Sequence, residues 1–163
     1  MTLSFCSFSS GSSGNCYLIR SENTAILVDA GISARKILEG LDKTGTPKER
    51  LAALLITHEH IDHTKSVRTI MKKMKTMKAY ANAMTWARIG GQVCDEQKET
   101  FETGESFLIG DISVKTFRVF HDAAEPVGFT FSSGGKQISI VTDTGSICEE
   151  IITEIKDADI LIL

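Results

Sequence analysis

Three histidines and one aspartate lie close together in residues 58–63, which read His-Glu-His-Ile-Asp-His. Imidazole and carboxylate groups are common ligands for divalent cations in proteins. His58 and His60 are two positions apart, so in extended backbone both side chains point to the same side and can share one ion. Asp62 and His63 come after the chain turns, and we expect them to face a second ion nearby. A solvated polar loop or a hydrogen-bonded core histidine is the alternative, but this density of ligand-type residues favours a metal site.

The segment differs from the commonest signature of zinc hydrolases. In that signature, His-Glu-x-x-His, the two histidines lie four positions apart on a helix. The fourth position after His58 is Asp62 in this chain. The zinc-peptidase helix is therefore excluded, and we expect the ligands at the end of a strand instead.

The residues on either side of the segment predict how it is held. Residues 51–56 are apolar and have the length and composition of a buried strand. After the segment, apolar residues at helical spacing predict an amphipathic helix with a buried face formed by Val67, Ile70, Met71 and Met74. The other face of the same helix carries Lys65, Arg68, Lys72 and Lys75. The sequence thus predicts a strand that delivers the ligands and one helix that follows them.

Three further ligand-type residues each follow a predicted strand. The strands are residues 24–28, 112–120 and 136–142, and the residues that follow them are Asp29, His121 and Asp143. A single aspartate after a strand is usually a turn or cap residue. Four strand ends that all carry ligand-type residues are better explained by one site, because loops at strand ends assemble sites on a sheet scaffold.

The rest of the pattern indicates strands first and then strands that alternate with helices. Further strands are predicted at residues 2–8, 16–19, 78–81, 106–109, 127–132 and 158–163. Further helices are predicted from Ser33 to about Leu41, at residues 83–89, and from Ser146 onward with Ile147, Ile151, Ile152 and Ile155 inward. The polar residues 92–100 predict no element. The fold class is therefore α+β or α/β, with mixed β-sheets flanked by helices in one domain over residues 1–163.

Composition is typical of a globular protein outside the membrane. The 163 residues are 42% hydrophobic and 24% charged, and no apolar run approaches the roughly 20 residues that a membrane span needs. The start of the chain has neither the basic nor the apolar region of a signal peptide. The four cysteines show no C-x-x-C pairing, which favours reduced thiols and argues against a zinc ribbon. We expect a cytoplasmic protein with no membrane partner, and the sequence leaves its oligomeric state open.

Basic residues are concentrated directly after the candidate metal segment. Six of the 18 lysine and arginine residues lie between positions 65 and 78, where no acidic residue occurs, although the net charge of the chain is −3. The net charge argues against indiscriminate binding to nucleic acid, whereas the local cluster would steer an anionic substrate toward the site. A solvated helix face that keeps the protein soluble is the alternative.

The motifs resemble those of the metallo-β-lactamase superfamily in order and spacing. The matching residues are Asp29, the segment 58–63, His121 and Asp143. Two long strings, residues 10–16 and 121–128, and the short string 142–145 also resemble the bacterial YycJ/WalJ branch of that superfamily. That branch is associated with exonuclease action on DNA. The resemblance covers the whole chain and implies the N-terminal part of an αββα sandwich.

The resemblance also implies the parts of a dinuclear metal site. The first ion would be held by His58, His60 and His121, and the second by Asp62 and His63, with Asp143 as the bridge. Asp62 and His63 are also the residues expected to be catalytic, and Asp29 would orient ligands without binding metal. A bridging aspartate rather than cysteine is typical of the nuclease and phosphodiesterase members. Zn²⁺ is the first candidate ion, and Mn²⁺ and Fe²⁺ are alternatives because carboxylates also suit them.

The function implied by this pattern is hydrolysis of phosphodiester bonds of DNA by a metal-dependent, 5′–3′ exonuclease-like enzyme. Two ions would lower the pKa of a shared water for in-line attack on phosphorus. The basic helix would contact the DNA backbone without reading sequence. The residues proposed for those contacts are Lys65, Arg68, Lys72 and Lys75.

One motif of the superfamily is missing from the chain. The fifth motif is a further histidine in a second half of similar size, and no histidine follows His121 here. The chain also ends inside an apolar strand, and an ordered edge strand needs neighbours. We therefore expect a truncated domain that holds one ion tightly and is inactive on DNA by itself.

Two other functions are compatible with the same residues. A hydrolase of a small thioester or lactone would use the same ions, and its turnover would not depend on the basic helix. A non-catalytic metal-binding fragment is the third possibility. Metal content and an assay on end-labelled DNA distinguish these functions.

Overall fold

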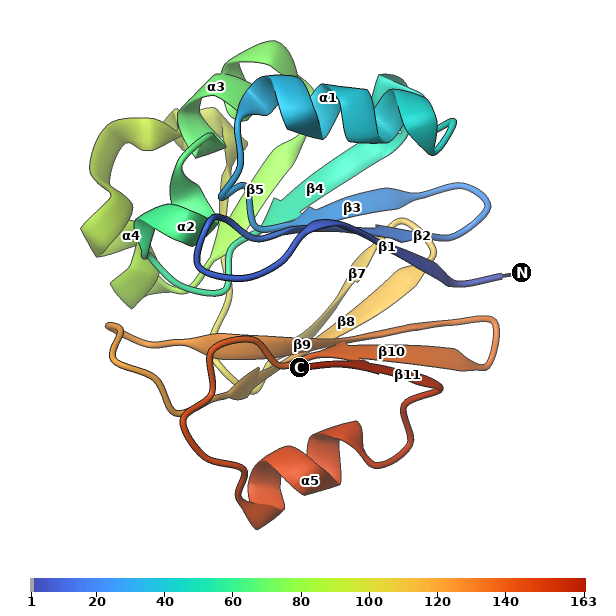
Figure 1. The fold of residues 1–163 in the computed structure, drawn as a ribbon, viewed down its shortest axis with the longest axis vertical. Helices are drawn as coiled ribbons and strands as arrows, with labels where there is room; N and C mark the ends of the chain where they lie inside the picture. Colours follow the sequence, from blue (N-terminus) through green and yellow to red (C-terminus); the bar gives the residue numbers. More distant parts are fainter. Residues whose placement is uncertain (1) are drawn as a thin grey trace.

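The computed structural model describes residues 2–163, in which two β-sheets stack face to face and helices cover the outer face of each sheet (Figure 1). The helices α1 (Ala34–Lys43) and α3 (Val67–Lys73) lie over the first sheet, and α5 (Glu149–Ile155) lies over the second. This four-layer order confirms the predicted αββα sandwich.

The first sheet is mixed and has six strands in the spatial order of the sequence. They are β1 (Ser4–Ser9), β2 (Cys16–Arg20), β3 (Ala25–Val28), β4 (Leu51–Leu55), β5 (Lys78–Ala81) and β6 (Lys98–Thr100). Strands β1 to β3 pair antiparallel, and β3 to β6 pair parallel. Parallel neighbours need crossover connections, which are supplied by α1, then by α2 (Ile61–Thr64) with α3, and then by α4 (Ala83–Ile89). As a result, the carboxyl ends of β3 and β4 lie side by side.

The second sheet has five strands in the order β11-β10-β9-β8-β7. They are β7 (Ser106–Ile109), β8 (Ile112–Arg118), β9 (Val127–Ser133), β10 (Lys136–Ile140) and β11 (Ile160–Ile162). Strands β7 to β10 are antiparallel, and β11 pairs parallel to β10. The strands predicted at residues 106–109, 112–120, 127–132 and 136–142 are therefore confirmed. Short 3₁₀ helices lie at Lys48–Arg50, Gly90–Gln92 and Asp95–Gln97.

Apolar layers lie on both faces of the first sheet, and a smaller apolar cluster lies under α5. In β3, Leu27 faces the helices, whereas Ile26 and Val28 face the second sheet. Phe129 and Phe131 of β9 are fully buried in the layer between the sheets. This alternation follows from the period of two in strand side chains, and it explains why the central strands read as continuous apolar runs.

Helix α1 confirms the prediction from its sequence. The Ser33 hydroxyl accepts a hydrogen bond from the backbone N–H of Lys36 at 3.4 Å, as a helix N-cap does. Ile37 and Leu41, four positions apart on one face, are fully buried under the helix.

The helix predicted after the metal segment is confirmed as α3, but it is shorter than expected, and a separate short helix, α2, lies at the end of the segment itself. In a continuous helix the carbonyl groups of Asp62 and His63 would accept from residues four positions later. Instead they accept from the backbone N–H groups of Asn15, at 2.7 Å, and Ala30, at 2.8 Å. The chain therefore breaks at Lys65 and restarts as α3. The predicted apolar face of that helix is nevertheless buried, at Val67, Ile70, Met71 and Met74.

The last helix begins later than predicted, at Glu149 rather than Ser146. Residues 144–146 are engaged elsewhere, because the Gly145 N–H donates to the carbonyl of Phe120 at 2.7 Å. Ile151 is buried as predicted, but Ile147 and Ile152 are about half exposed, which contradicts their predicted inward position.

The sequence analysis missed strand β6. Its residues, Lys98 to Thr100, are polar because it is an edge strand that pairs on one side only. No helix in residues 2–163 has the length and apolar character needed to cross a membrane.

Candidate metal centre

Three loops are joined by backbone hydrogen bonds where β3 and β4 end. The Asn15 N–H donates to the Asp62 carbonyl, and the Gly31 N–H donates to the Asn15 carbonyl at 2.8 Å. The Ala30 N–H donates to the His63 carbonyl in the same region. These bonds connect segments that are far apart in the sequence, so they fix the backbone of the site before any side chain is considered.

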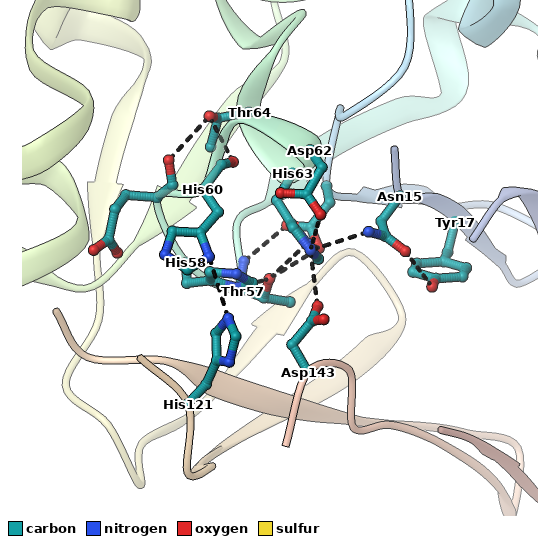
Figure 2. Close-up of polar contacts among 12 residues, drawn as sticks. Asn15, Tyr17, Thr57, His58, His60, Asp62, His63, Thr64, His121 and Asp143 are labelled. Atoms are coloured by element: carbon teal, nitrogen blue, oxygen red, sulfur yellow. Dashed lines mark hydrogen bonds and ion pairs between the residues drawn. The ribbon is translucent and has the colours of Figure 1, made fainter. Parts of the chain in front are cut away.

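The first group of ligand-type residues consists of His58, His60 and His121. One ring nitrogen from each lies within 4.8 Å of the other two. Nδ1 of His60 and Nε2 of His121 are 3.2 Å apart and face each other (Figure 2). Two nitrogens bound at about 2.05 Å to one tetrahedral ion would be separated by about 3.3 Å. The spacing therefore suits a shared cation.

His58 has a buried ring nitrogen available for a cation. Thr57 donates its hydroxyl proton to Asp29 and so accepts from Nδ1 of His58, at 3.0 Å. That leaves a lone pair on Nε2 of His58, which is buried and has no hydrogen-bond partner among the described residues. Burial, with the neighbouring His63 as a further cause, lowers the pKa of His58 to about 4. The imidazole is therefore neutral, and an unpaired buried acceptor is what a missing cation would leave.

The second group consists of His58, His63 and Asp143, whose ligand-type atoms also lie within 4.8 Å of one another. Nε2 of His63 is 2.8 Å from a carboxylate oxygen of Asp143 and 3.6 Å from one of Asp62. The structure thus brings Asp62, His63 and Asp143 together as expected, and it adds His58, whose ring centre is 4.1 Å from that of His63. The two groups adjoin at His58.

Asp29 determines which nitrogen of His63 faces the site. Its fully buried carboxylate accepts from Nδ1 of His63 at 2.7 Å, and from the N–H and the hydroxyl of Thr57, both at 2.9 Å. Since Nδ1 carries this proton, Nε2 presents its lone pair toward Asp143. Burial disfavours the charged ring, but Asp29, Asp143 and Asp62 together raise the pKa of His63.

Two aspartates of the site have strained backbone. Asp29 and Asp143 have φ angles of 60° and 55°, and they are the non-glycine residues with positive φ in the described chain. This conformation is uncommon for residues with a Cβ atom and is often found at functional sites. Both residues follow a strand, and the left-handed turn directs each carboxylate back toward His63.

We expect Asp29→Asn to weaken cation binding by roughly 10–100-fold, the range for residues that orient metal ligands. The amide would keep an acceptor for Thr57 but lose the charge that holds the Nδ1 proton of His63. Competition with a metal-sensitive dye measures the affinity. Asp111→Asn is a matched control, because Asp111 bonds Ser21 in the turn between β7 and β8. Unchanged cation affinity with a lowered melting temperature would show that Asp29 is only a turn residue.

The four basic residues proposed for DNA contacts do not share one helix. All four are exposed, but Lys65 follows α2, Arg68 and Lys72 lie in α3, and Lys75 comes after α3 has ended. Lys75 lines a hollow with Lys48 and Glu49, which precede β4. The metal centre lies at the carboxyl end of β4, away from this hollow. Of the four basic residues, only Lys65 and Arg68 directly follow the metal ligands in the chain.

Three residues that contact the site were missed by the sequence analysis: Asn15, Thr57 and Glu59. Asn15 is buried, and its amide nitrogen lies 3.0 Å from Nε2 of His63 (Figure 2). Asn15 falls in the serine- and glycine-rich string 10–16, whose conformation the sequence does not predict. Thr57 could have been predicted from its position in the sequence, because it lies between a buried strand and the first histidine.

Glu59 connects the metal segment to the loop that carries His121. His58 and His60 point toward the ion position, so the residue between them faces the opposite side. There one carboxylate oxygen of Glu59 accepts from the backbone N–H of Ala124 at 2.8 Å, and the other is buried without a partner among the described residues. The same loop is anchored by Asn82, which donates to the Glu125 carbonyl at 2.7 Å.

Comparison with known proteins identifies the same fold and relatives over most of the chain. A family model described as the beta-lactamase superfamily domain matches residues 24–163. The exodeoxyribonuclease WalJ of Streptococcus pneumoniae (strain D39) is 37% identical over 155 residues, which are 92% of this chain and 57% of that protein. The exodeoxyribonuclease YycJ of Bacillus anthracis is 35% identical over 163 residues, which are 98% of this chain and 61% of that protein. The chain therefore spans about three fifths of these relatives.

Solved structures share the fold at low sequence identity. Zn²⁺-bound PqqB from Methylobacterium extorquens has a TM-score of 0.76 at 20% identity, over 90% of this chain and 58% of that one. The metallo-beta-lactamase fold protein YhfI from Bacillus subtilis has a TM-score of 0.75 at 16% identity, over 91% of this chain and 62% of that one. At such identities the likeness concerns the architecture alone.

Proposed function

We propose, from the premise that this chain belongs to the metallo-β-lactamase-fold superfamily in its WalJ/YycJ-like branch, that it is part of a metal-dependent hydrolase acting on phosphodiester bonds of DNA. The observation that carries the proposal is the pair of ligand groups that adjoin at His58. One group has only imidazole ligands, and the other adds carboxylates that are partly open to solvent at Asp62 and Asp143. A substrate can therefore reach the second group.

The residues present fit two divalent cations. His58, His60 and His121 would hold the first, and His63 with Asp62 and Asp143 would hold the second, with Asp143 as the candidate bridge. The chemistry supplied by two such cations is a water of lowered pKa and stabilisation of charge on phosphoryl oxygens. The protein's part is to keep His58 neutral by burial and to fix His63 through Asp29. Zn²⁺ suits the imidazole group, and Mn²⁺ or Fe²⁺ would suit the carboxylates as well.

DNA as the substrate is supported by two relatives that are named exodeoxyribonucleases. Because the chain spans only 57% and 61% of those proteins, their activity is a proposal for this one. Attack from a 5′ end belongs to the same proposal. The basic residues Lys65 and Arg68 are the candidates for contacts with the DNA backbone near the site, because they directly follow α2 and begin α3.

We expect the double substitution of Lys65 and Arg68 by glutamine to weaken DNA binding and to reduce its salt dependence. The slope of log affinity against log salt should fall by up to about 0.9 per lost phosphate contact on duplex DNA. Fluorescence anisotropy of labelled DNA, titrated with protein at several salt concentrations, measures this slope. The matched control is the double substitution of Lys73 and Lys75, which line the hollow at the far end of β4. Equal slopes for the two double variants would contradict a DNA path that begins at Lys65.

The direct test is hydrolysis of end-labelled DNA by the dialysed protein, with Zn²⁺ or Mn²⁺ added back. The assay uses the 163-residue chain and, where a natural protein contains that chain, the longer protein as well. We expect stepwise loss of nucleotides that disappears with His63→Ala in the longer protein. Turnover of a thioester or lactone but not of DNA, with no effect of the Lys65 and Arg68 substitutions, would overturn the proposal in favour of a small-molecule hydrolase.

A further inference from the structure

Asn15 has one amide proton that is aimed into the candidate metal centre. The side chain is 4% exposed and lies in the loop between β1 and β2. Its nitrogen points toward Nε2 of His63 and donates to it at 3.0 Å (Figure 2). Asn15 is not among the ligand-type residues, since its amide nitrogen has no lone pair for a cation.

The other polar positions of the amide are already occupied, so its orientation is fixed. Its oxygen accepts from the backbone N–H of Gly11 at 2.9 Å and from the hydroxyl of Tyr17 at 3.1 Å. Its nitrogen donates to the carbonyl of Gly11 at 3.1 Å. Turning the amide over would set its N–H groups against the Gly11 N–H and lose these bonds. The remaining N–H therefore points toward His63 in any state of the site.

That N–H and a cation compete for the same lone pair. Nδ1 of His63 donates to Asp29, so Nε2 is the nitrogen through which His63 can hold a cation with Asp143. Once a cation binds Nε2, the Asn15 N–H loses its acceptor. A buried donor without a partner is costly, and its fixed direction means that a new acceptor must come to it. The carboxylates of Asp62 and Asp143 lie 3.6 and 2.8 Å from the same Nε2 and are partly exposed, so an acceptor on a substrate can approach this nitrogen from solvent.

We propose that Asn15 is a substrate-positioning residue whose free N–H donates a hydrogen bond to an anionic phosphoryl oxygen beside the second ligand group. This inference rests on the proposed function and identifies the Asn15 N–H as the group that binds the negatively charged oxygen of the substrate. A neutral amide suits that position because it donates to an anion without opposing it, whereas a carboxylate would repel the same oxygen. Tyr17 and Gly11 are the residues that hold the amide in place.

The test separates anion binding from cation binding in the zinc-loaded protein, with inorganic phosphate as the probe. Titration calorimetry measures both affinities for Asn15→Asp and Asn15→Ala. Asn15→Asp keeps the oxygen that accepts from Gly11 and Tyr17, but it replaces the donor by a second oxygen. We expect phosphate to bind at least about tenfold more weakly, as for loss of a hydrogen bond to a charged group, while Zn²⁺ binds as tightly as before or more tightly.

Asn15→Ala should weaken phosphate binding to a similar degree with less than a threefold change in Zn²⁺ affinity. A merely structural role would lower both affinities together, along with the melting temperature, and that outcome would overturn the inference. Unchanged phosphate affinity in both folded variants would also overturn it. Tyr17→Phe is the matched control, since it removes one bond to the amide oxygen and leaves the N–H in place. It should weaken phosphate binding by no more than about threefold.

A measurement on the unaltered protein covers the case in which the variants do not fold. In the zinc-loaded state, addition of phosphate should shift one side-chain amide proton of Asn15 downfield in a nitrogen–proton correlation spectrum. No shift at saturating phosphate would overturn the inference. The proposed function is judged separately by DNA hydrolysis, so a protein that cleaves DNA without this shift would retain its activity assignment and lose only the role of Asn15.

Discussion

His121→Ala should abolish tight binding of the first cation, with a loss of affinity of at least about 100-fold, the upper end of the loss for residues that only orient ligands. His121 is one of three imidazoles in the first group, and it comes from the second sheet whereas the other two follow β4. Its loss would leave His58 and His60, which are too few ligands for a closed tetrahedral shell. Elemental analysis after dialysis, and the absorption of bound Co²⁺, measure the effect.

The unaltered 163-residue chain should retain about one cation after dialysis. The first group offers three ring nitrogens, and the second offers His63 and carboxylates that are partly exposed, so the second ion should exchange readily. His63→Ala is the matched control, because it removes a ligand of the second group and should leave the retained cation in place. Two tightly held ions in the unaltered chain, or retention of one ion by His121→Ala, would contradict this assignment of ligands.

Gly31→Ala should destabilise the protein by more than about 4 kcal/mol or prevent folding, the range of exceptional substitutions. A Cβ atom at Gly31 would lie 1.6 Å from the carbonyl oxygen of Asp62 and 2.7 Å from the backbone nitrogen of Asn15. Both contacts are with backbone, and the same groups bond to each other at 2.7 Å. The loops cannot separate without losing that bond and the position of Asp62.

The matched control for this substitution is Gly91→Ala. A Cβ atom there would meet nothing within 4 Å, and the φ angle of −80° suits any residue. We expect the free energy of unfolding to change by less than about 1 kcal/mol, in either direction, because alanine also restricts the unfolded chain. Thermal and urea unfolding of both variants measure the difference. A folded Gly31→Ala protein with a midpoint near that of Gly91→Ala would contradict the close approach of the three loops.

Much of the candidate site could be predicted because its information is local. The apolar runs of β3 and β4 identify buried strands, and ligand-type residues at their ends identify a site. Asp29, His121 and Asp143 are separated by long stretches of chain, yet each follows a strand, and strand ends meet at one edge of a sandwich. The order of elements predicted mixed β-sheets flanked by helices, and the resemblance to the metallo-β-lactamase superfamily implied the αββα sandwich.

The parts that could not be predicted depend on bonds between distant segments. Lys65 and Lys75 were expected on the helix that follows the metal segment, but the carbonyl groups of Asp62 and His63 are taken by Asn15 and Ala30, and α3 spans only Val67 to Lys73. Strand β6 was missed because an edge strand buries little and its residues carry no apolar pattern. The basic residues from Lys65 to Lys75 are close in the sequence, but in the structure they extend from the metal centre to the opposite end of β4.

The sequence by itself determined which residues of this protein have the chemistry of cation ligands, because that chemistry belongs to the side chain and the spacing of these residues follows from the strand. The tertiary structure decided how those residues are held. It places Asn15 against His63, Glu59 against the loop of His121, and Asp29 against Nδ1 of His63. Each of these contacts joins groups at least 30 residues apart, so no local pattern encodes it. Folding supplies them because the buried polar groups must find partners wherever the packed sheets bring them together.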